Sequence, residues 1–263
     1  MVELIASISA SAVAICRGKI RWTRRVLAWS VCLWTIATTV AFAQCPSPPV
    51  TATQQRIERI IDGDTFVLVG GDRVRVLGIN TYERNDPERR GAYAKAATQY
   101  ATQQLQTRVV TLSPYPYRRD RHGRVLAHVW VNGAHLAESL LHEGLGFAVA
   151  VPPLTAHAPC LFAAEKRARL AARGIWSEGL APIAVSDLSR GGFAVVEGVV
   201  TRVDQRTLWL GAQFAVTLPK GLNIDAGTRI EVRGWIRGPK AGDAPAVFRL
   251  PLADPANLQR SVD

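Results

Sequence analysis

Residues 57–83 read IERIIDGDTFVLVGGDRVRVLGINTYE, and this stretch decides the fold of the first half of the chain. Two apolar, β-branched runs, residues 66–69 and 74–77, flank Gly70 and Gly71, a pattern that predicts a β-hairpin. Side chains alternate between the two faces of a strand, so Arg75 is expected on the face opposite Val74 and Val76.

Polar residues stand at the ends of this hairpin, and we expect them to cluster at one edge of a small sheet. Asp64, Asn80 and the Thr81 carbonyl offer oxygen ligands of the kind that Ca²⁺ takes. Glu83 is suited to activate a water molecule, and Arg75 to bind phosphate through paired hydrogen bonds. The set suits phosphodiester hydrolysis, although a D-G-D-T sequence is also simply a turn.

Further motifs downstream make the pattern specific, and together they resemble the staphylococcal nuclease-like (thermonuclease) family over residues 57–177. The matching pieces, in chain order, are DGDT at residues 62–65, R-x-x-G-I-x-T-x-E at 75–83, D-x-x-G-R-x-L-A at 120–127 and G-I-W-S at 174–177.

The resemblance implies an OB-fold nuclease with a calcium cofactor. By position it assigns catalysis to Arg75, Glu83 and Arg124, and the metal site to Asp64, Asn80 and Thr81. This family normally has Asp where the chain has Asn80. The type enzyme also places aromatic residues against the nucleotide, whereas residues 148–153 contain no tyrosine and His122 stands where an aromatic is usual. Weaker nucleotide binding would follow from that loss of stacking.

Residues 1–43 carry the features of a secretory signal peptide. Five basic residues precede an uncharged apolar run at 26–43, which ends in an A-x-A cleavage site. The prediction is an exported protein, periplasmic or extracellular, without a stable membrane partner once the signal is cleaved. The alternative is an uncleaved anchor through residues 26–43, because the run just reaches spanning length.

Cysteine count and charge agree with export and a polyanionic partner. Cys45 and Cys160 remain after residue 43, an even pair, and a disulfide is expected between them. Residues 1–43 hold five basic residues and one acidic residue, so the remaining chain carries a net charge of +7. Such a balance favours nucleic acid as partner. The oligomeric state stays open.

The rest of the chain predicts an α+β protein. Helices are expected within residues 92–105, 135–145 and 162–172, and strands at 109–112 and 125–131, which with the hairpin suit a five-stranded OB-type barrel. The predicted organisation is a signal peptide at 1–43, a Pro-rich arm at 44–56, a nuclease-like OB domain at 57–177, a linker at 178–192 and a small all-β, OB-like domain at 193–253.

Two tryptophans of the C-terminal domain leave two interpretations open. Trp209 and Trp235 either form a stacking and phosphate-binding surface with Arg202, Arg229, Arg233 and Arg237, or are ordinary core residues. The five histidines show no metal-binding spacing, and His122 alone is placed beside the proposed site.

The prediction for the whole chain is a secreted, calcium-dependent nuclease that hydrolyses DNA, with RNA as a further candidate substrate. The alternative is a non-catalytic nucleic-acid-binding protein that keeps the barrel. Asn80 favours the alternative, because it contributes no charge to a calcium site. Glu83 favours the enzyme, because a carboxylate repels phosphate and has no place in a pure binding surface.

Overall fold

The computed structural model describes residues 44–86, 88–106, 109–240, 242 and 246–260. The predicted signal peptide and the alternative membrane anchor lie outside these residues. Residues Ala41–Asp263 form one compact unit, and the predicted domain boundaries within it stay a prediction. Within the described part of the chain, no helix combines the length and apolar character needed to cross a membrane.

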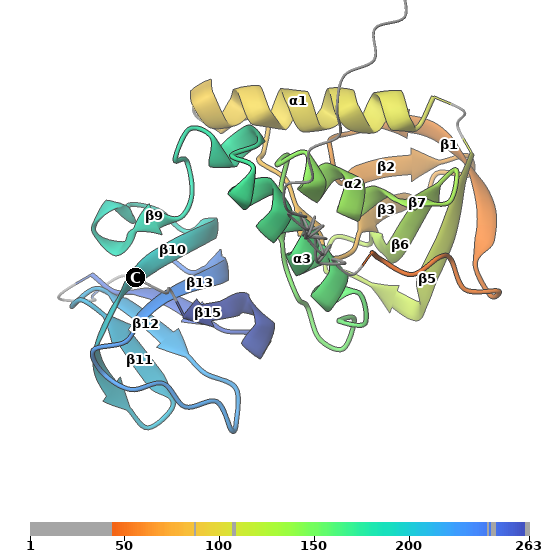
Figure 1. Cartoon of the computed structure of the whole chain (residues 1–263). Helices are drawn as coiled ribbons and strands as arrows, with labels where there is room; N and C mark the ends of the chain where they lie inside the picture. Colours follow the sequence, from red (N-terminus) through yellow and green to blue (C-terminus); the bar gives the residue numbers. More distant parts are fainter. Residues whose placement is uncertain (1–43, 87, 107–108, 241, 243–245, 261–263) are drawn as a thin grey trace, which may run out of the picture. The chain divides into compact units, whose positions relative to one another are not determined.

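The first half of the unit is a closed β-barrel (Figure 1). Its strands follow the order β3-β2-β1-β5-β6, and β3 pairs with β6 to close the ring. The predicted hairpin is confirmed, since β2 and β3 pair antiparallel with Thr65 opposite Arg75. The bounds are β1 (Thr53–Ile60), β2 (Thr65–Leu68), β3 (Arg73–Val76), β5 (Val109–Arg119) and β6 (Val125–Val131), with the short strands β4 (Ile79–Asn80), β7 (Ala134–His135) and β8 (Phe147–Ala148) at the margins.

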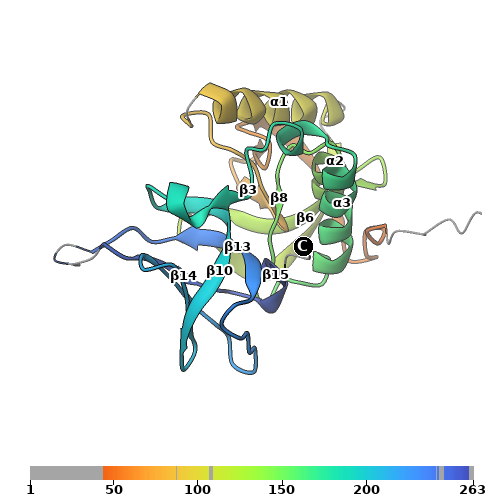
Figure 2. The ribbon, with the colours of Figure 1, turned by 60° about the vertical axis from the view of Figure 1, so that its left-hand side comes forward.

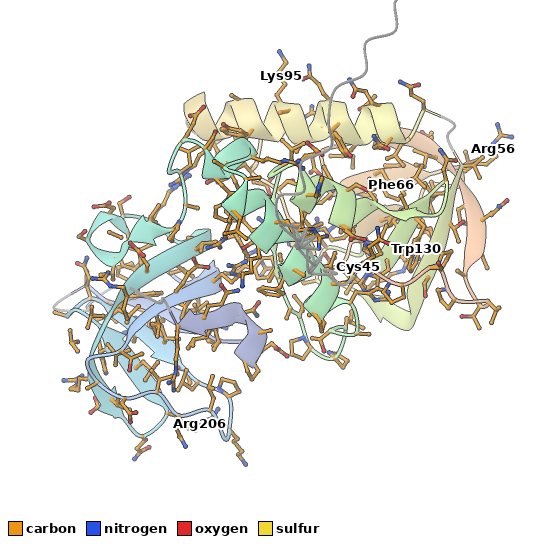
Figure 3. The ribbon with its side chains drawn as sticks, in the orientation of Figure 1. Cys45, Arg56, Phe66, Lys95, Trp130 and Arg206 are labelled. Carbon is orange, nitrogen blue, oxygen red and sulfur yellow. A yellow bond between two sulfur atoms is a disulfide. The ribbon has the colours of Figure 1, made fainter. Side chains whose placement is uncertain are left out.

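Alternation along the strands fills the barrel. Val74 and Val76 are buried in its core with Phe66, whereas Arg75 points to the other face, as the sequence predicts. Figure 3 shows Phe66 inside the barrel, while the exposed Arg56 and Lys95 project away from it. The five-stranded barrel with helices is therefore confirmed.

Three helices pack around the barrel: α1 (Glu88–Gln104), α2 (Leu136–His142) and α3 (Ala158–Leu170). The Ala-rich α1 buries Ala94, Ala97 and Ala101 along one face. A Schellman cap follows the last residue of α2, with Gly144 in the left-handed conformation at a φ of +67°. The Gly144 N–H donates to the Leu141 carbonyl, and the Leu145 N–H donates to the Leu140 carbonyl.

The predicted disulfide is confirmed, with the Cα atoms of Cys45 and Cys160 5.1 Å apart. It ties the N-terminal arm to the first turn of α3. Next to it, the indole N–H of Trp130 donates to the Pro46 carbonyl at 3.0 Å (Figure 3). The arm is thus attached at two neighbouring points, to α3 through the disulfide and to β6 of the barrel through Trp130.

Residues 183–260, which we call the C-terminal lobe, form a second curled sheet. Its path is β14-β12-β11-β10-β13-β15, and β9 pairs with β10. The strand pattern predicts most of it; β9 falls in the predicted linker, and β15 lies beyond the predicted domain. The bounds are β9 (Ile183–Ala184), β10 (Gly192–Asp204), β11 (Thr207–Leu210), β12 (Phe214–Thr217), β13 (Arg229–Ile236), β14 (Phe248–Pro251) and β15 (Leu258–Arg260), with the 3-10 turns η2 (Val185–Asp187) and η3 (Pro255–Asn257). A further 3-10 turn, η1 (Gly174–Trp176), follows α3 before the lobe begins.

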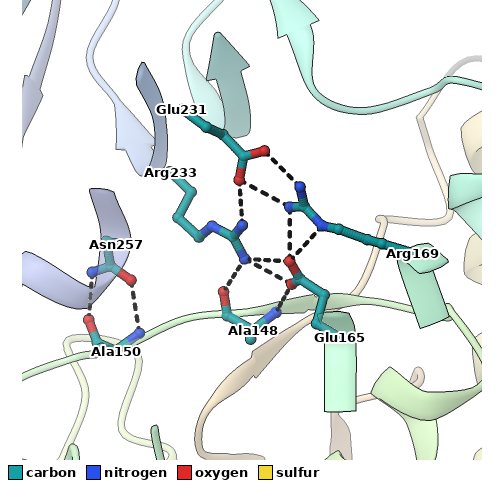
Figure 4. A network of polar contacts seen from close by, with 7 residues as sticks. All are labelled: Ala148, Ala150, Glu165, Arg169, Glu231, Arg233 and Asn257. Carbon is teal, nitrogen blue, oxygen red and sulfur yellow. Dashed lines mark hydrogen bonds and ion pairs between the residues drawn. The ribbon is translucent and has the colours of Figure 1, made fainter. Parts of the chain in front are cut away.

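The C-terminal lobe contacts the barrel through β8 and α3 (Figure 2). Arg233 of β13 is fully buried and bonds to Glu165 of α3 and to the Ala148 carbonyl of β8 (Figure 4). Alongside, the Asn257 side chain exchanges two hydrogen bonds with the backbone of Ala150. The suggestion that Arg233 belongs to a phosphate-binding surface is therefore wrong, because its guanidinium is used inside the protein.

Candidate active site

The D-G-D-T turn is held against α1 by its glycine. A Cβ atom on Gly63 would lie 2.7 Å from the Cβ of Ala97 and 2.9 Å from a methyl carbon of Thr81. Both distances are shorter than side chains tolerate, so this position requires glycine. The close approach brings the turn between α1 and the chain that leaves β4.

Asp64 is the buried centre of the site. Its Oδ2 accepts from the Thr81 N–H at 2.9 Å and the Thr81 hydroxyl at 3.1 Å, and forms an ion pair with Arg75 at 2.8 Å. The Thr65 hydroxyl donates to its Oδ1 at 3.0 Å. Hydrogen bonds to both oxygens and the neighbouring guanidinium hold this carboxylate in a fixed orientation.

Both polar atoms of the Asn80 side chain are hydrogen-bonded within the protein, so the amide is not positioned as a metal ligand. Its Oδ1 accepts from Arg75 Nη2 at 2.9 Å, and its Nδ2 donates to the Thr81 carbonyl at 3.1 Å. The Thr81 carbonyl, a second expected ligand, is thus engaged by the first. An amide nitrogen cannot bind a hard cation, so Asn80 has to rotate before both oxygens are available.

Arg124 reaches the site from the loop before β6. Asp120 accepts from its Nε at 2.7 Å and from its N–H at 3.0 Å, which fixes the start of the side chain. Burial raises the pKa of Asp120, but hydrogen bonds from Arg124 and His122 outweigh it and lower that pKa. Arg124 Nη1 lies 3.5 Å from the Thr65 hydroxyl, and so stands next to Asp64.

Two further carboxyl groups near Asp64 have raised pKa values. Burial and the charge of Asp64 raise the pKa of Asp62 to about 6. Burial raises the pKa of Glu83 as well, and Asp64 adds to the shift. Asp62, Asp64 and Glu83 therefore lie close enough to influence one another's charge. The sequence prediction included Asp64 and Glu83 in the site but not Asp62.

A cleft of about 860 Å³ gathers most of the predicted site residues. Asp64, Arg75, Asn80, Glu83 and Arg124 all line it. Thr81 instead lines an adjoining hollow of about 360 Å³, together with Asn80 and Glu83. The structure thus assembles in one place residues spread over 60 positions of sequence.

The donor set of the cleft suits a hard divalent cation. Together with the adjoining hollow it offers carboxylate oxygens from Asp62, Asp64 and Glu83 and the carbonyl oxygen of Thr81, and burial and the charge of Asp64 raise the pKa of Asp62. Across the described ranges, no three His, Cys, Asp or Glu side chains stand in the arrangement of a metal centre. A cation here would accordingly depend on carbonyl, amide and water oxygens as well.

A closed five-stranded barrel with acids and arginines facing one cleft defines an OB-fold phosphodiester hydrolase. Residues 73–178 match the family model described as staphylococcal nuclease homologue. The thermonuclease of Staphylococcus intermedius is 32% identical over 134 residues, which cover 49% of this chain and 80% of the relative. For the thermonuclease of Staphylococcus hyicus the identity is 30%, with 46% and 75% covered. Endonuclease YncB of Bacillus subtilis is 33% identical, with 46% and 61% covered.

The chain therefore belongs to the staphylococcal nuclease family, as the motifs predict, and it is a nuclease. Members of this family are metal-dependent, and their substrates are nucleic acids. The comparisons accordingly favour the enzyme over a non-catalytic binding protein.

The sequence prediction left Asp62 out of the site, and it named Trp235 only for a candidate surface of the C-terminal domain. Asp62 lies two positions before Asp64, and its carboxylate accepts the Asp64 N–H at 3.0 Å. Its spacing within the D-G-D-T turn is the signal that could have included it. Trp235 lines the cleft from the C-terminal lobe, and nothing in the sequence around it indicates that it meets residues 64–124.

Proposed function

We propose that this nuclease is exported, that it uses Ca²⁺, and that it hydrolyses the phosphodiester bonds of DNA and, as a second substrate, of RNA. The observation that carries the proposal is the position of Asp64. It is held by Arg75 and Thr81, while Glu83 and Arg124 line the same cleft.

The residues that would hold Ca²⁺ are Asp64, the Thr81 carbonyl and Asn80 after its amide has rotated, with Asp62 nearby. When bound, the ion supplies positive charge next to a phosphate oxygen and polarises it for attack. Asp62 and Asp64 attract such a cation because the two carboxylates have one guanidinium, Arg75, close to both of them.

Glu83 is the group we assign to activating water. It is exposed to the cleft, and its pKa, raised by burial and by the charge of Asp64, makes it a stronger base than an ordinary glutamate. The loop that carries it is braced by the Glu83 N–H, which donates to Asp86 at 3.1 Å.

Arg75 and Arg124 are the groups we assign to the phosphate. Negative charge grows on the phosphate oxygens in the transition state, and fixed guanidinium donors stabilise it best when they need not reorganise. Arg75 is fixed by Asp64, Asn80 and the Val76 carbonyl, and Arg124 by Asp120. The two arginines thus approach the cleft from β3 and from the loop before β6.

Export is supported by the Cys45–Cys160 disulfide. Disulfides form and persist in oxidising compartments and are rare in the cytosol. The net positive charge of the chain suits diffusion toward a polyanionic substrate.

Digestion of single-stranded DNA and single-stranded RNA by the protein tests the proposal. Cutting is expected with Ca²⁺, and none with a chelator. Glu83→Gln is the matched control, because it should bind the same oligonucleotides in Ca²⁺ without cutting them. Full activity in chelator would refute the calcium assignment. Binding without cutting by the unaltered protein would restore the non-catalytic alternative.

A further inference from the structure

Trp235 brings an aromatic ring from the C-terminal lobe into the cleft. It lies on β13 between the buried residues Gly234 and Ile236, and 45% of its surface is exposed. The ring lines the cleft that contains Asp64 and Glu83. It also lines two adjoining hollows, of about 360 and 400 Å³. A nucleic-acid strand that extends from the cleft into either hollow would therefore pass the Trp235 side chain.

The ring is held in place by a row of aromatic contacts. Phe193, its partner on β10, meets it edge-on, with ring centroids 5.2 Å apart and an angle of 72°. Phe193 in turn contacts Phe147 of β8 at 5.7 Å, and Phe147 pairs with Asn80 across β4 and β8. These contacts restrict the rotation of the indole, while 45% of the Trp235 surface stays exposed. The support for Trp235 thus runs from the C-terminal lobe to the strand that carries Asn80.

Basic side chains line both hollows beside the ring. In the part of the chain that the structure describes, the 400 Å³ hollow has no acidic residue in its lining, whereas the 360 Å³ hollow also has Glu83, Asp86 and Asp187. The exposed Arg121 lines both the cleft and the 400 Å³ hollow, where Arg237 joins it. In the 360 Å³ hollow stand Arg90 and Arg190, the latter paired with Asp86 at 2.5 Å. An aromatic platform between basic side chains is the arrangement with which proteins hold unpaired nucleotides.

Among the described residues that line the cleft, Trp235 is the sole Phe, Tyr or Trp side chain. Any stacking of a base within the cleft by such a ring therefore falls to Trp235. A base can reach the face of the ring only after it leaves its own helical stack. Duplex substrates would have to open first, which costs free energy.

We propose that Trp235 stacks on the base of a nucleotide next to the scissile phosphate, and that the C-terminal lobe thereby directs the enzyme to single-stranded nucleic acid. The inference rests on the proposed function of the cleft, because it takes the scissile phosphate to lie between Glu83 and Arg124. It gives the C-terminal lobe a role in substrate binding and none in the chemistry of the bond.

The test compares Trp235→Ala, Trp235→Phe and a matched control, Trp209→Ala. Trp209 belongs to the same lobe, where Arg202 lies 4.6 Å from its ring centroid, and it does not line the cleft. Loss of one stacked base should raise KM for a single-stranded oligonucleotide by about 5- to 100-fold. The change in kcat should be small. Trp235→Phe should recover most of the loss, and Trp209→Ala should behave like the unaltered protein.

Oligonucleotides with one abasic position separate stacking from a structural effect. When the abasic site stands at the stacked nucleotide, Trp235→Ala should no longer weaken binding, because the ring has no base to lose. With duplex DNA the variant should likewise change KM little. An equal loss on intact and abasic strands, or an unchanged KM on both, overturns the proposal.

Anisotropy measurements with labelled strands in Ca²⁺ keep this result separate from the proposed chemistry. If the unaltered protein binds but does not cut, while Trp235→Ala weakens only the binding of the intact strand, stacking holds and the nuclease mechanism fails. If the protein cuts and Trp235→Ala matches it in binding and in KM, stacking fails alone.

Discussion

Arg233 of β13 and Glu165 of α3 form an ion pair of 2.7 Å in which neither side chain is more than 2% exposed. Arg233 also bonds to Glu231 and to the Ala148 carbonyl, and Arg169 bonds to both glutamates (Figure 4). Two arginines and two glutamates thus neutralise each other where the C-terminal lobe meets the barrel. This pairing keeps β13, and with it Trp235, in a fixed position beside the cleft.

We expect Arg233→Met to destabilise the protein by about 3–5 kcal/mol, because it leaves two buried glutamates with Arg169 as their one cation among the residues of this network. Urea unfolding measures the change. Arg119→Met is the matched control: its pair with Asp72 is half exposed on both sides, so the loss should stay below about 1 kcal/mol. Equal effects of the two substitutions would contradict the role of the buried pair.

Replacing Glu83 with Gln should lower kcat by about 100-fold or more, since the amide cannot take a proton from water. Thermal unfolding should hardly change, because Glu83 is exposed. Glu143→Gln, a half-buried acid outside the cleft, serves as control. The raised pKa of Glu83 predicts that activity falls, as pH is lowered, at a pH above the ordinary glutamate value of 4.5. A pH–rate profile that stays flat down to that value would exclude Glu83 as the base.

Asn80→Asp should reduce the Ca²⁺ concentration needed for half-maximal activity, because a second anionic ligand joins Asp64 and the donation to the Thr81 carbonyl is lost. Calorimetric Ca²⁺ titration of both forms measures this directly. Asn85→Asp adds the same charge to the exposed loop beyond Glu83 and should shift the titration far less. If both forms of residue 80 bind Ca²⁺ equally, Asn80 is not a ligand.

Acid sensitivity should come from a histidine cluster beside the disulfide. His128 and His135 lie 3.1 Å apart (Nδ1 to Nε2), and the ring of His157 lies 4.0 Å from that of His128. Burial, and the neighbouring imidazoles, lower the pKa of His128 and of His135 to about 3. Both side chains therefore stay neutral in the folded protein where the unfolded chain is already protonated.

The resulting stability is complete above pH 6.5 and is lost as pH falls from 6.5 toward 3, because the unfolded chain takes up protons first. At pH 5 the loss amounts to at most about 2 kcal/mol for each group. His128→Gln should flatten the fall between pH 6.5 and 5 in urea unfolding. His142→Gln should not, since His142 lies outside the cluster, is only partly buried and pairs with Glu143. Parallel slopes in all three proteins would disprove this origin of acid sensitivity.

Local sequence patterns predicted much of the barrel. Alternating apolar residues around Gly70 and Gly71 predict β2 and β3, and the Ala-rich run predicts α1, because these preferences act between residues a few positions apart. The motifs assigned Arg75, Glu83 and Arg124 to one cleft through resemblance, and the structure brings them there. Their chemical roles stay a prediction.

Local sequence patterns could not predict which polar side chains are buried, or which residues far apart in the sequence pair with each other. Arg233 reads as a surface arginine in the sequence, yet it is buried because Glu165, 68 positions earlier, meets it. His128, His135 and His157 share no motif, and α2 and α3 bring them together.

The sequence by itself determined the β2–β3 hairpin, the helices, the disulfide partners and the family, because alternation, turn residues, cysteine parity and motif spacing are local or countable. The strands β1, β9 and β15 fell outside the predicted strands. Only the tertiary structure decided that burial and the charge of Asp64 raise the pKa of Asp62, that the Asn80 amide donates to the Thr81 carbonyl, and that Trp235 lines the cleft. The physical reason is that desolvation, amide orientation and stacking depend on which distant side chains lie within a few ångströms, and packing alone sets that.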